Sequence, residues 1–164
     1  MRGRLLGLIT AAGLATAAVI TPTLSQAAGS TGQRIRVFAD EQVGFEKFVD
    51  VDRSGGPSAG DLDLERYPII SPDTGERVGT GINDILVVRL LAKGDLIGLV
   101  DGTLILPGGR IMLAGSSRVS AFERGARFAV VGGTGSFRDA QGTALAKNGK
   151  LNGHSGQYLT IELS

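Results

Sequence analysis

The segment GINDILVVRLLAKGDLIGLVDGTLIL, residues 81–106, holds two long strand signals on either side of a turn. Apolar and β-branched residues fill Arg77–Leu91 and Asp95–Leu106, and the turn-forming pair Lys93-Gly94 separates them. Such runs bounded by glycine predict strands. The second run is apolar on both of its faces, so a strand there needs cover on both sides. We expect another copy of the chain to cover its outer face or, if the fold is a sandwich, a loop.

Strand signals of the same kind recur along the rest of the chain. They lie at Arg34–Asp40, Phe45–Asp52, Asp61–Tyr67, Arg110–Val119, Arg127–Val131, Gly142–Lys147 and Gln157–Leu163. Further turns are predicted at Asp73-Thr74-Gly75, Pro107-Gly108-Gly109 and Asn148-Gly149, and the one competing helical stretch, Phe137–Lys147, is interrupted by Gly142. About eight short strands predict an all-β protein, either an eight-stranded antiparallel barrel or a sandwich. A barrel of that size has an interior that side chains fill or that holds one small ligand.

The N-terminus has the pattern of a secretory signal peptide. Arg2 and Arg4 precede the uncharged apolar run Leu5–Ile20, and Ser25-Gln26-Ala27 offers small residues at a cleavage site. The apolar run is shorter than the roughly 20 residues that cross a bilayer. We therefore expect residues 1–27 to be removed and a single domain, residues 28–164, to be secreted, with no stable membrane insertion after cleavage.

Composition excludes several classes of chemistry. The 164 residues include no Cys and one His, so disulfides, thiolate nucleophiles, zinc–cysteine sites and multi-histidine metal sites are excluded. The formal net charge of +1 gives no basic stripe for nucleic acid, and we expect none to bind. The single histidine, His154, lies between glycines in a predicted turn and is expected to be an exposed loop residue. We expect no cofactor and no metal.

Two glycine-rich motifs resemble ligand sites without matching them. Ala129–Gly135 reads like a strand that enters a dinucleotide-binding turn, but Arg138 stands where the third glycine belongs. The loop that begins Asp50-Val51-Asp52-Arg53-Ser54-Gly55 has Asp61 at its twelfth position, as in a calcium-binding loop. It lacks flanking helices and ends in Asp, so whether Asp50, Asp52 and Asp61 bind Ca²⁺ is left open.

The candidate site residues come from strand alternation. In Asp61–Tyr67, the side chains of Asp61, Asp63, Glu65 and Tyr67 share one face, and those of Leu62 and Leu64 share the other. The polar face therefore meets solvent or lines a polar cavity. We predict Asp61 and Glu46 as acid/base groups, and Asp63 and Tyr67 as ligand-binding residues beside the barrel mouth.

Arginines inside strand patterns form a second set of candidates. Arg89 and Arg118 would stabilise negative charge on a ligand if their side chains face inward. We predict them as ligand-binding residues, although alternation also allows each one to face solvent.

In Ala129–Ala144, AVVGGTGSFRDAQGTA, the run VVGGTG is followed by an aromatic residue, a basic residue and A-x-G. This motif is similar to a dirigent pattern, and from Gly60 to the C-terminus the chain resembles the allene oxide cyclase/dirigent protein superfamily. Gln141 stands where dirigent proteins usually carry Arg. Weaker matches are Gly75–Gly81, similar to V-G-x-x-x-G, and Gly60-Asp61. The cyclases have a Cys on the strand after V-G, and this chain has none; Ile85 lies near the corresponding place.

The resemblance implies an eight-stranded antiparallel barrel, a homotrimer, and a cavity for a hydrophobic small molecule. It makes Arg138, a motif match, a third catalytic candidate. Allene oxide cyclase closes a ring by holding its substrate in one conformation, whereas dirigent proteins orient phenoxy radicals that they do not generate. Two functions are therefore open: a cofactor-free isomerase or cyclase, or a non-catalytic dirigent-like or carrier protein that binds and orients an apolar ligand.

Overall fold

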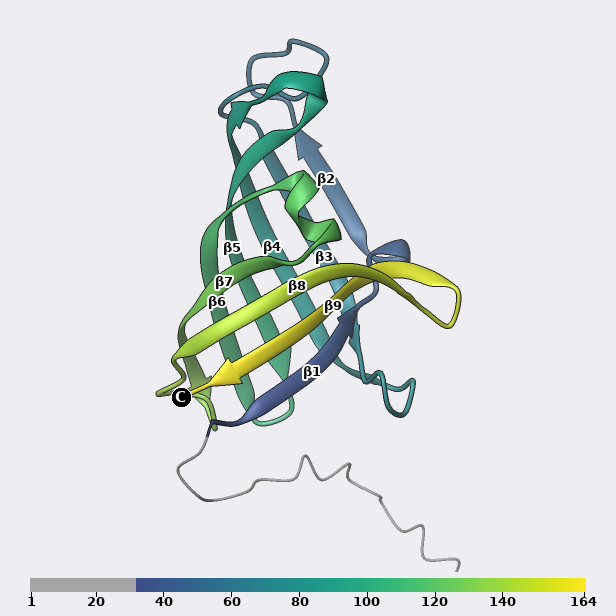
Figure 1. Cartoon of the computed structure of the whole chain (residues 1–164), viewed down its shortest axis with the longest axis vertical. Coiled ribbons are helices and arrows are strands. Elements are labelled where there is room, and N and C mark those ends of the chain that lie inside the picture. Colours follow the sequence, from purple (N-terminus) through teal and green to yellow (C-terminus); the bar gives the residue numbers. More distant parts are fainter. Residues whose placement is uncertain (1–31) are drawn as a thin grey trace, which may run out of the picture.

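A computed structural model describes residues 32–164 as one antiparallel β-barrel (Figure 1). Its strands are β1 (Arg34–Ala39), β2 (Phe45–Val49), β3 (Leu62–Ile70), β4 (Arg77–Leu90), β5 (Leu96–Leu106), β6 (Gly109–Arg118), β7 (Ala126–Gly135), β8 (Gly142–Leu151) and β9 (His154–Leu163). Three short 3₁₀ turns join them: η1 (Glu41–Val43), η2 (Ala92–Gly94) and η3 (Val119–Glu123). The proposed signal peptide lies outside the described residues. None of the described helices is long and apolar enough to cross a membrane.

Each strand from β2 to β9 pairs with its neighbour in sequence, and β1 closes the barrel. β1 pairs with β9 along its whole length and with β3 at Phe38 and Ala39 only. The other half of β3, Leu62–Arg66, pairs with β2. β1 and β2 thus share one position beside β3, which makes the eight-stranded antiparallel barrel that the sequence predicts, with one extra strand.

The inward-facing side chains form a solid core at one end of the barrel. Its large, almost fully buried side chains, each at most 1% exposed, include Ile69, Leu104, Ile111 and Ile161. This end holds the β5–β6 turn and the C-terminus, at the bottom of Figure 1. Toward the opposite end the inward positions of the same strands line a cavity instead. The core therefore closes the floor of that cavity.

One sequence prediction about the last hairpin is wrong. Asn148-Gly149 does not turn the chain but lies inside β8, which continues to Leu151. The turn is formed by Asn152 and Gly153, whose φ angles are +51° and +88°. Positive φ at both central residues is what a tight hairpin turn requires, and Asn-Gly supplies it. The strand predicted from Gly142 is confirmed, because β8 begins there, and the competing helical stretch at 137–147 does not form.

The loop between β2 and β3 is fastened by the buried carboxylate of Asp61. This side chain is 0% exposed; one oxygen accepts a hydrogen bond from the Val51 N–H at 2.8 Å, and the other from the Ser58 N–H at 2.6 Å. The Asp61 backbone carbonyl also accepts from Val87 on β4. A single residue therefore ties both ends of the loop to the barrel wall.

Asp61→Asn is expected to lower the free energy of unfolding by about 1–3 kcal/mol, because an amide nitrogen would face one of the two N–H donors that the buried carboxylate accepts from. The urea midpoint of the variant measures this loss. Asp139→Asn, at an exposed site, is the matched control and should leave the midpoint unchanged. Equal midpoints for the two variants would show that Asp61 does not hold the loop.

Candidate functional site

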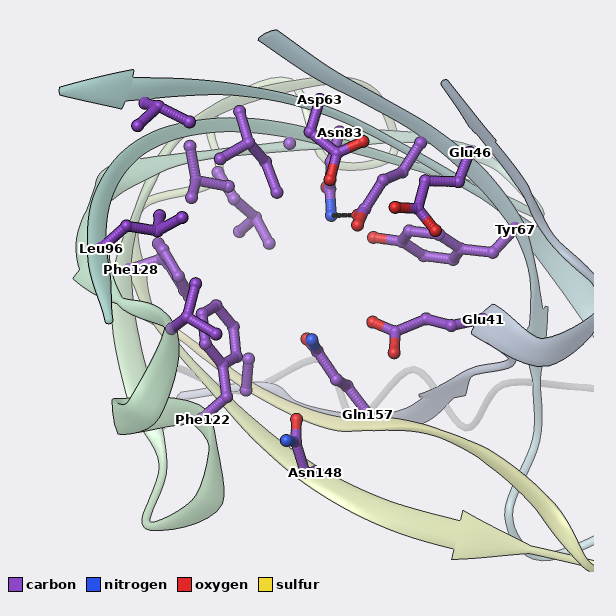
Figure 2. Close-up of a pocket in the computed structure, with 18 of the residues that line it drawn as sticks. Glu41, Glu46, Asp63, Tyr67, Asn83, Leu96, Phe122, Phe128, Asn148 and Gln157 are labelled. Atoms are coloured by element: carbon purple, nitrogen blue, oxygen red, sulfur yellow. Dashed lines mark hydrogen bonds between the residues drawn. The ribbon is translucent and has the colours of Figure 1, made fainter. Parts of the chain in front are cut away.

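The upper half of the barrel encloses a cavity of about 430 Å³ that opens near η1 (Figure 2). Inward positions of β3, β4, β5, β6, β7, β8 and β9 line it, and η1, η3 and β2 complete the mouth. The volume suits a small organic molecule.

One wall of the cavity is acidic. Glu46 on β2, Asp63 and Glu65 on β3, and Glu41 on η1 all line the cavity. Figure 2 shows Glu41, Glu46 and Asp63 directed into the same space. The alternation of β3 puts its two acids on the inner face, and the pairing of β2 with β3 brings Glu46 directly opposite Glu65. Strand register therefore assembles most of the cluster.

Tyr67 and Asn83 complete this wall. The Glu65 carboxylate accepts a hydrogen bond of 3.0 Å from the Asn83 side chain on β4. Tyr67, 5% exposed, packs its ring over Gly81, where any side chain would collide with it. Its hydroxyl points toward the cavity in Figure 2. A buried, rigid polar group is thus presented to a bound ligand.

The opposite wall is apolar. Phe122 of η3 and Phe128 of β7 lie with ring centroids 5.9 Å apart, and Leu96 at the start of β5 lies beside them. Asn148 and Gln157, on β8 and β9, lie between the two walls in Figure 2. The cavity is therefore divided into a side that binds apolar surface and a side that bears carboxyl groups.

Crowding raises the pKa of several carboxyl groups. Loss of hydration, together with the negative charges of Glu65 and Glu46, raises the pKa of Glu41 to about 7. Burial and the charge of Glu46 raise the pKa of Asp63. A carboxyl group with a pKa close to 7 can donate or accept a proton at physiological pH.

Two inner residues of the acidic wall are shifted in the same direction. Burial raises the pKa of Glu65, against the hydrogen bond from Asn83, which lowers it. Burial and the neighbouring Glu65 and Glu41 raise the pKa of Tyr67, which therefore stays a neutral hydroxyl. The wall thus combines carboxyl groups whose pKa is raised with a neutral hydrogen-bonding phenol.

Contacts from the far end of the chain hold η1, and with it Glu41, at the mouth. The Asp40 carboxylate, just before η1, lies 2.8 Å from Nδ1 of His154. The Gln42 side chain accepts a hydrogen bond of 3.0 Å from the Ser155 N–H. His154 was expected to be an exposed loop residue; it is exposed, but it begins β9 and pairs with Asp40, which is 6% exposed.

The structure brings only some of the sequence candidates to the cavity. Glu46, Asp63 and Tyr67 line it. Asp61 does not, because its carboxylate is directed into the β2–β3 loop. The three arginines also lie outside the cavity: Arg89 and Arg118 are exposed, and the exposed Arg138 is 3.4 Å from Asp139. No side chain of positive charge lines the cavity among the described residues.

Sequence reasoning missed Glu41, Asn83 and the aromatic wall. Glu65 was recognised on the polar face of its strand but was not selected. Asn83 faces inward in the long strand β4, so alternation was the available signal for it. Glu41 lies in an irregular segment, where alternation gives no signal.

The candidate calcium loop does bring its carboxylates together. Oxygens of Asp50, Asp52 and Asp61 lie within 4.8 Å of one another. The Asp50 carboxylate accepts hydrogen bonds from the N–H groups of Ser54 and Gly55, and Asp52 also accepts from Ser54. These backbone hydrogen bonds fold the loop and draw the three carboxylates together.

Comparisons with known proteins agree on the fold. No protein-family model matches the chain, and no curated protein matches it significantly. Among solved structures, a pyocyanin demethylase superposes with a TM-score of 0.67 at 14% identity, over 80% of this chain and 100% of that one.

Two further solved structures resemble the chain over most of its length. The pterocarpan synthase dirigent protein GePTS1 has a TM-score of 0.59 at 18% identity, over 89% of this chain and 98% of its own. The Diels-Alderase AbmU from Streptomyces koyangensis has a TM-score of 0.60 at 14% identity, over 84% of this chain and 72% of its own. At these identities the likeness establishes the fold alone. The chain therefore has the β-barrel fold shared by dirigent proteins and Diels-Alderase cyclases, as the resemblance in its sequence predicts.

Proposed function

We propose that this protein binds a hydrophobic small molecule in its barrel and directs the cyclisation or isomerisation of that molecule without a cofactor. The observation that carries the proposal is the position of Glu41. This carboxyl group, whose pKa is about 7, faces an apolar wall across one cavity. Neighbours of the same fold that are named as a cyclase and as Diels-Alderases support it.

The apolar wall fixes the body of the substrate and excludes water from one side of it. Restricting a flexible molecule to one folded pose lowers the entropic part of the barrier to ring closure. Tyr67 and Asn83 supply hydrogen bonds that orient the polar end of the substrate. In this proposal the chain contributes shape first and proton transfer second.

The proton transfer is assigned to the mouth of the cavity. Glu41 in its acid form donates a proton to the substrate, and Glu46 accepts a proton that the substrate releases. The two transfers cancel, so the product is an isomer of the substrate. Exchange with solvent then restores both carboxyl groups, which the exposure of Glu41 and Glu46 allows.

Exposure of the mouth also favours a second candidate function, that of a dirigent-like or carrier protein that binds and orients its ligand without turnover. Water that reaches Glu41 and Glu46 weakens their electrostatic effect on a substrate. A carrier needs the cavity and its two walls but no proton donor. The two functions share a binding site and differ in whether an isomer appears.

Incubation of the full chain with a small-molecule extract of the producing culture tests these functions. An isomerase should consume one compound and form another of identical mass and different chromatographic retention, measured by liquid chromatography–mass spectrometry. Glu41→Gln should slow this conversion by about 10²-fold or more, because it removes the proton donor. The surface change Glu162→Gln is the control. Retention of a compound without formation of an isomer supports the carrier function. If the protein neither converts nor retains any compound, both functions are refuted.

Activity is expected to fall as pH rises through about 7, because Glu41 donates its proton only in the acid form. The rate at a series of pH values and a carboxyl-carbon NMR titration of Glu41 measure this.

The free energy of unfolding should also fall as pH rises. The folded-state pKa of Glu41 lies above the ordinary 4.5, so the contribution of this residue to stability is greatest below pH 4.5 and is lost as pH rises to about 7. A titration midpoint near 4.5 would contradict the assignment.

We further propose that the protein is exported and acts as a homotrimer through the outer face of β4–β7. Large apolar side chains are exposed on this face: Ile82, Leu86, Leu99, Met112 and Val131. Leu99 lies on β5, the strand whose two apolar faces predict cover by another copy. A face that exposes several large apolar side chains is typical of an interaction surface.

Light scattering of the eluting protein should give three times the chain mass of 16.9 kDa, less any cleaved signal peptide. Leu99→Asp should reduce it to one chain, because the charge would be buried at the contact. Lys147→Asp, on an exposed site of β8, is the control. A monomeric parent protein would contradict the trimer and would leave the cavity proposal unaffected.

A further inference from the structure

We propose that the ligand of the cavity is a lipophilic organic cation, with its apolar body against the phenylalanine wall and its positive charge facing the carboxylates of η1, β2 and β3. The inference rests on the proposed binding function and names the class of molecule that the cavity selects.

The acidic wall has no counter-charge of its own. The carboxyl groups of Glu41, Glu46, Asp63 and Glu65 line one cavity, and within residues 32–164 none of them forms an ion pair. No described lining residue is Lys, Arg or His. Asp63 and Glu65 are half-buried, and charges partly removed from water are ordinarily paired, so this acidic wall lacks a partner charge. A cationic ligand supplies it.

The hydrogen-bonding groups of this wall point to the same class of ligand. One oxygen of Asp63, Oδ1, is buried and has no hydrogen-bond partner. Tyr67 is 5% exposed and presents its hydroxyl to the cavity. Ionised carboxylates only accept hydrogen bonds, so a ligand with N–H donors or a positive charge matches them better than a neutral hydrocarbon.

The far wall explains why the cation must be lipophilic. Phe122, Phe128 and Leu96 offer no polar group, so a hydrated metal ion or a small polyamine would leave that half of the cavity unsatisfied. Aromatic faces also attract organic ammonium groups. An anionic ligand, by contrast, would be repelled by each carboxylate that is ionised.

A matched pair of probes isolates the charge. 4-Hydroxyphenyltrimethylammonium and 4-tert-butylphenol have the same shape and differ by one positive charge. Isothermal titration of the full chain at pH 8, above the pKa of about 7 of Glu41, should give at least tenfold tighter binding of the cation. Added salt should weaken binding of the cation and leave the affinity of the neutral probe nearly unchanged.

Variants locate the preference in the cavity. Glu41→Gln combined with Glu65→Gln should reduce the cation preference to less than threefold while the neutral probe still binds. Glu162→Gln combined with Asp139→Asn removes the same number of negative charges from the exposed outer surface and should keep the preference. Circular dichroism confirms that each variant is folded.

The outcomes of this experiment distinguish the preference for a cation from the proposed binding function of the cavity. Equal affinity for the two probes would overturn the cation assignment and leave a cavity that binds apolar molecules. A cation preference that the outer-surface variant also loses would place its origin on the surface and overturn the assignment. Failure of both probes to bind would overturn the cavity function and the inference together.

Discussion

Closure of the barrel through β1 is the constraint on which the site depends. This six-residue strand pairs with β9 from Arg34 to Ala39 but reaches β3 only at its last two residues. At that point Ala39 lies opposite Ile69, and both belong to the packed core. Beyond Ala39 the chain leaves the sheet, forms η1 and returns as β2, which pairs with β3 alone among the described strands. The opening that results is where Glu41 meets the cavity.

The clustered carboxyl groups, which destabilise the fold, lie at one end of the barrel, and the packed apolar core, which stabilises it, lies at the other. Four neighbouring carboxyl groups repel one another and lose hydration, and the raised pKa values of three of them show that cost. The packed core at the other end of the same strands compensates for it. Sites that bind ligands commonly retain such locally unfavourable arrangements, because the bound molecule relieves them.

The sequence predicts the strands well because the alternation of side chains is a local pattern. It predicts the site only in part because the mouth of the cavity is formed by residues far apart in the sequence. Asp63 and Tyr67 follow from the alternation of a single strand. Glu41 could not be found that way: its position depends on the Asp40–His154 contact, between residues more than a hundred positions apart. The last hairpin shows the same limit, since Asn148-Gly149 and Asn152-Gly153 are equivalent turn signals and only pairing between β8 and β9 selects the second.

A shared fold leaves the chemistry open, because the backbone determines how the barrel closes and the side chains determine what lines its cavity. Backbone pairing closes the barrel, whereas inward side chains on each strand set what the cavity holds, and those can change without altering the sheet. In this chain the acidic wall comes from η1, β2 and β3, and the aromatic wall from η3 and β7. Because Phe122 and Phe128 lie on elements other than those that carry the four carboxyl groups, recognition of the charge and of the apolar body of a ligand can vary largely independently. The ligand is therefore to be sought from the two walls of this cavity rather than from the names of its structural neighbours.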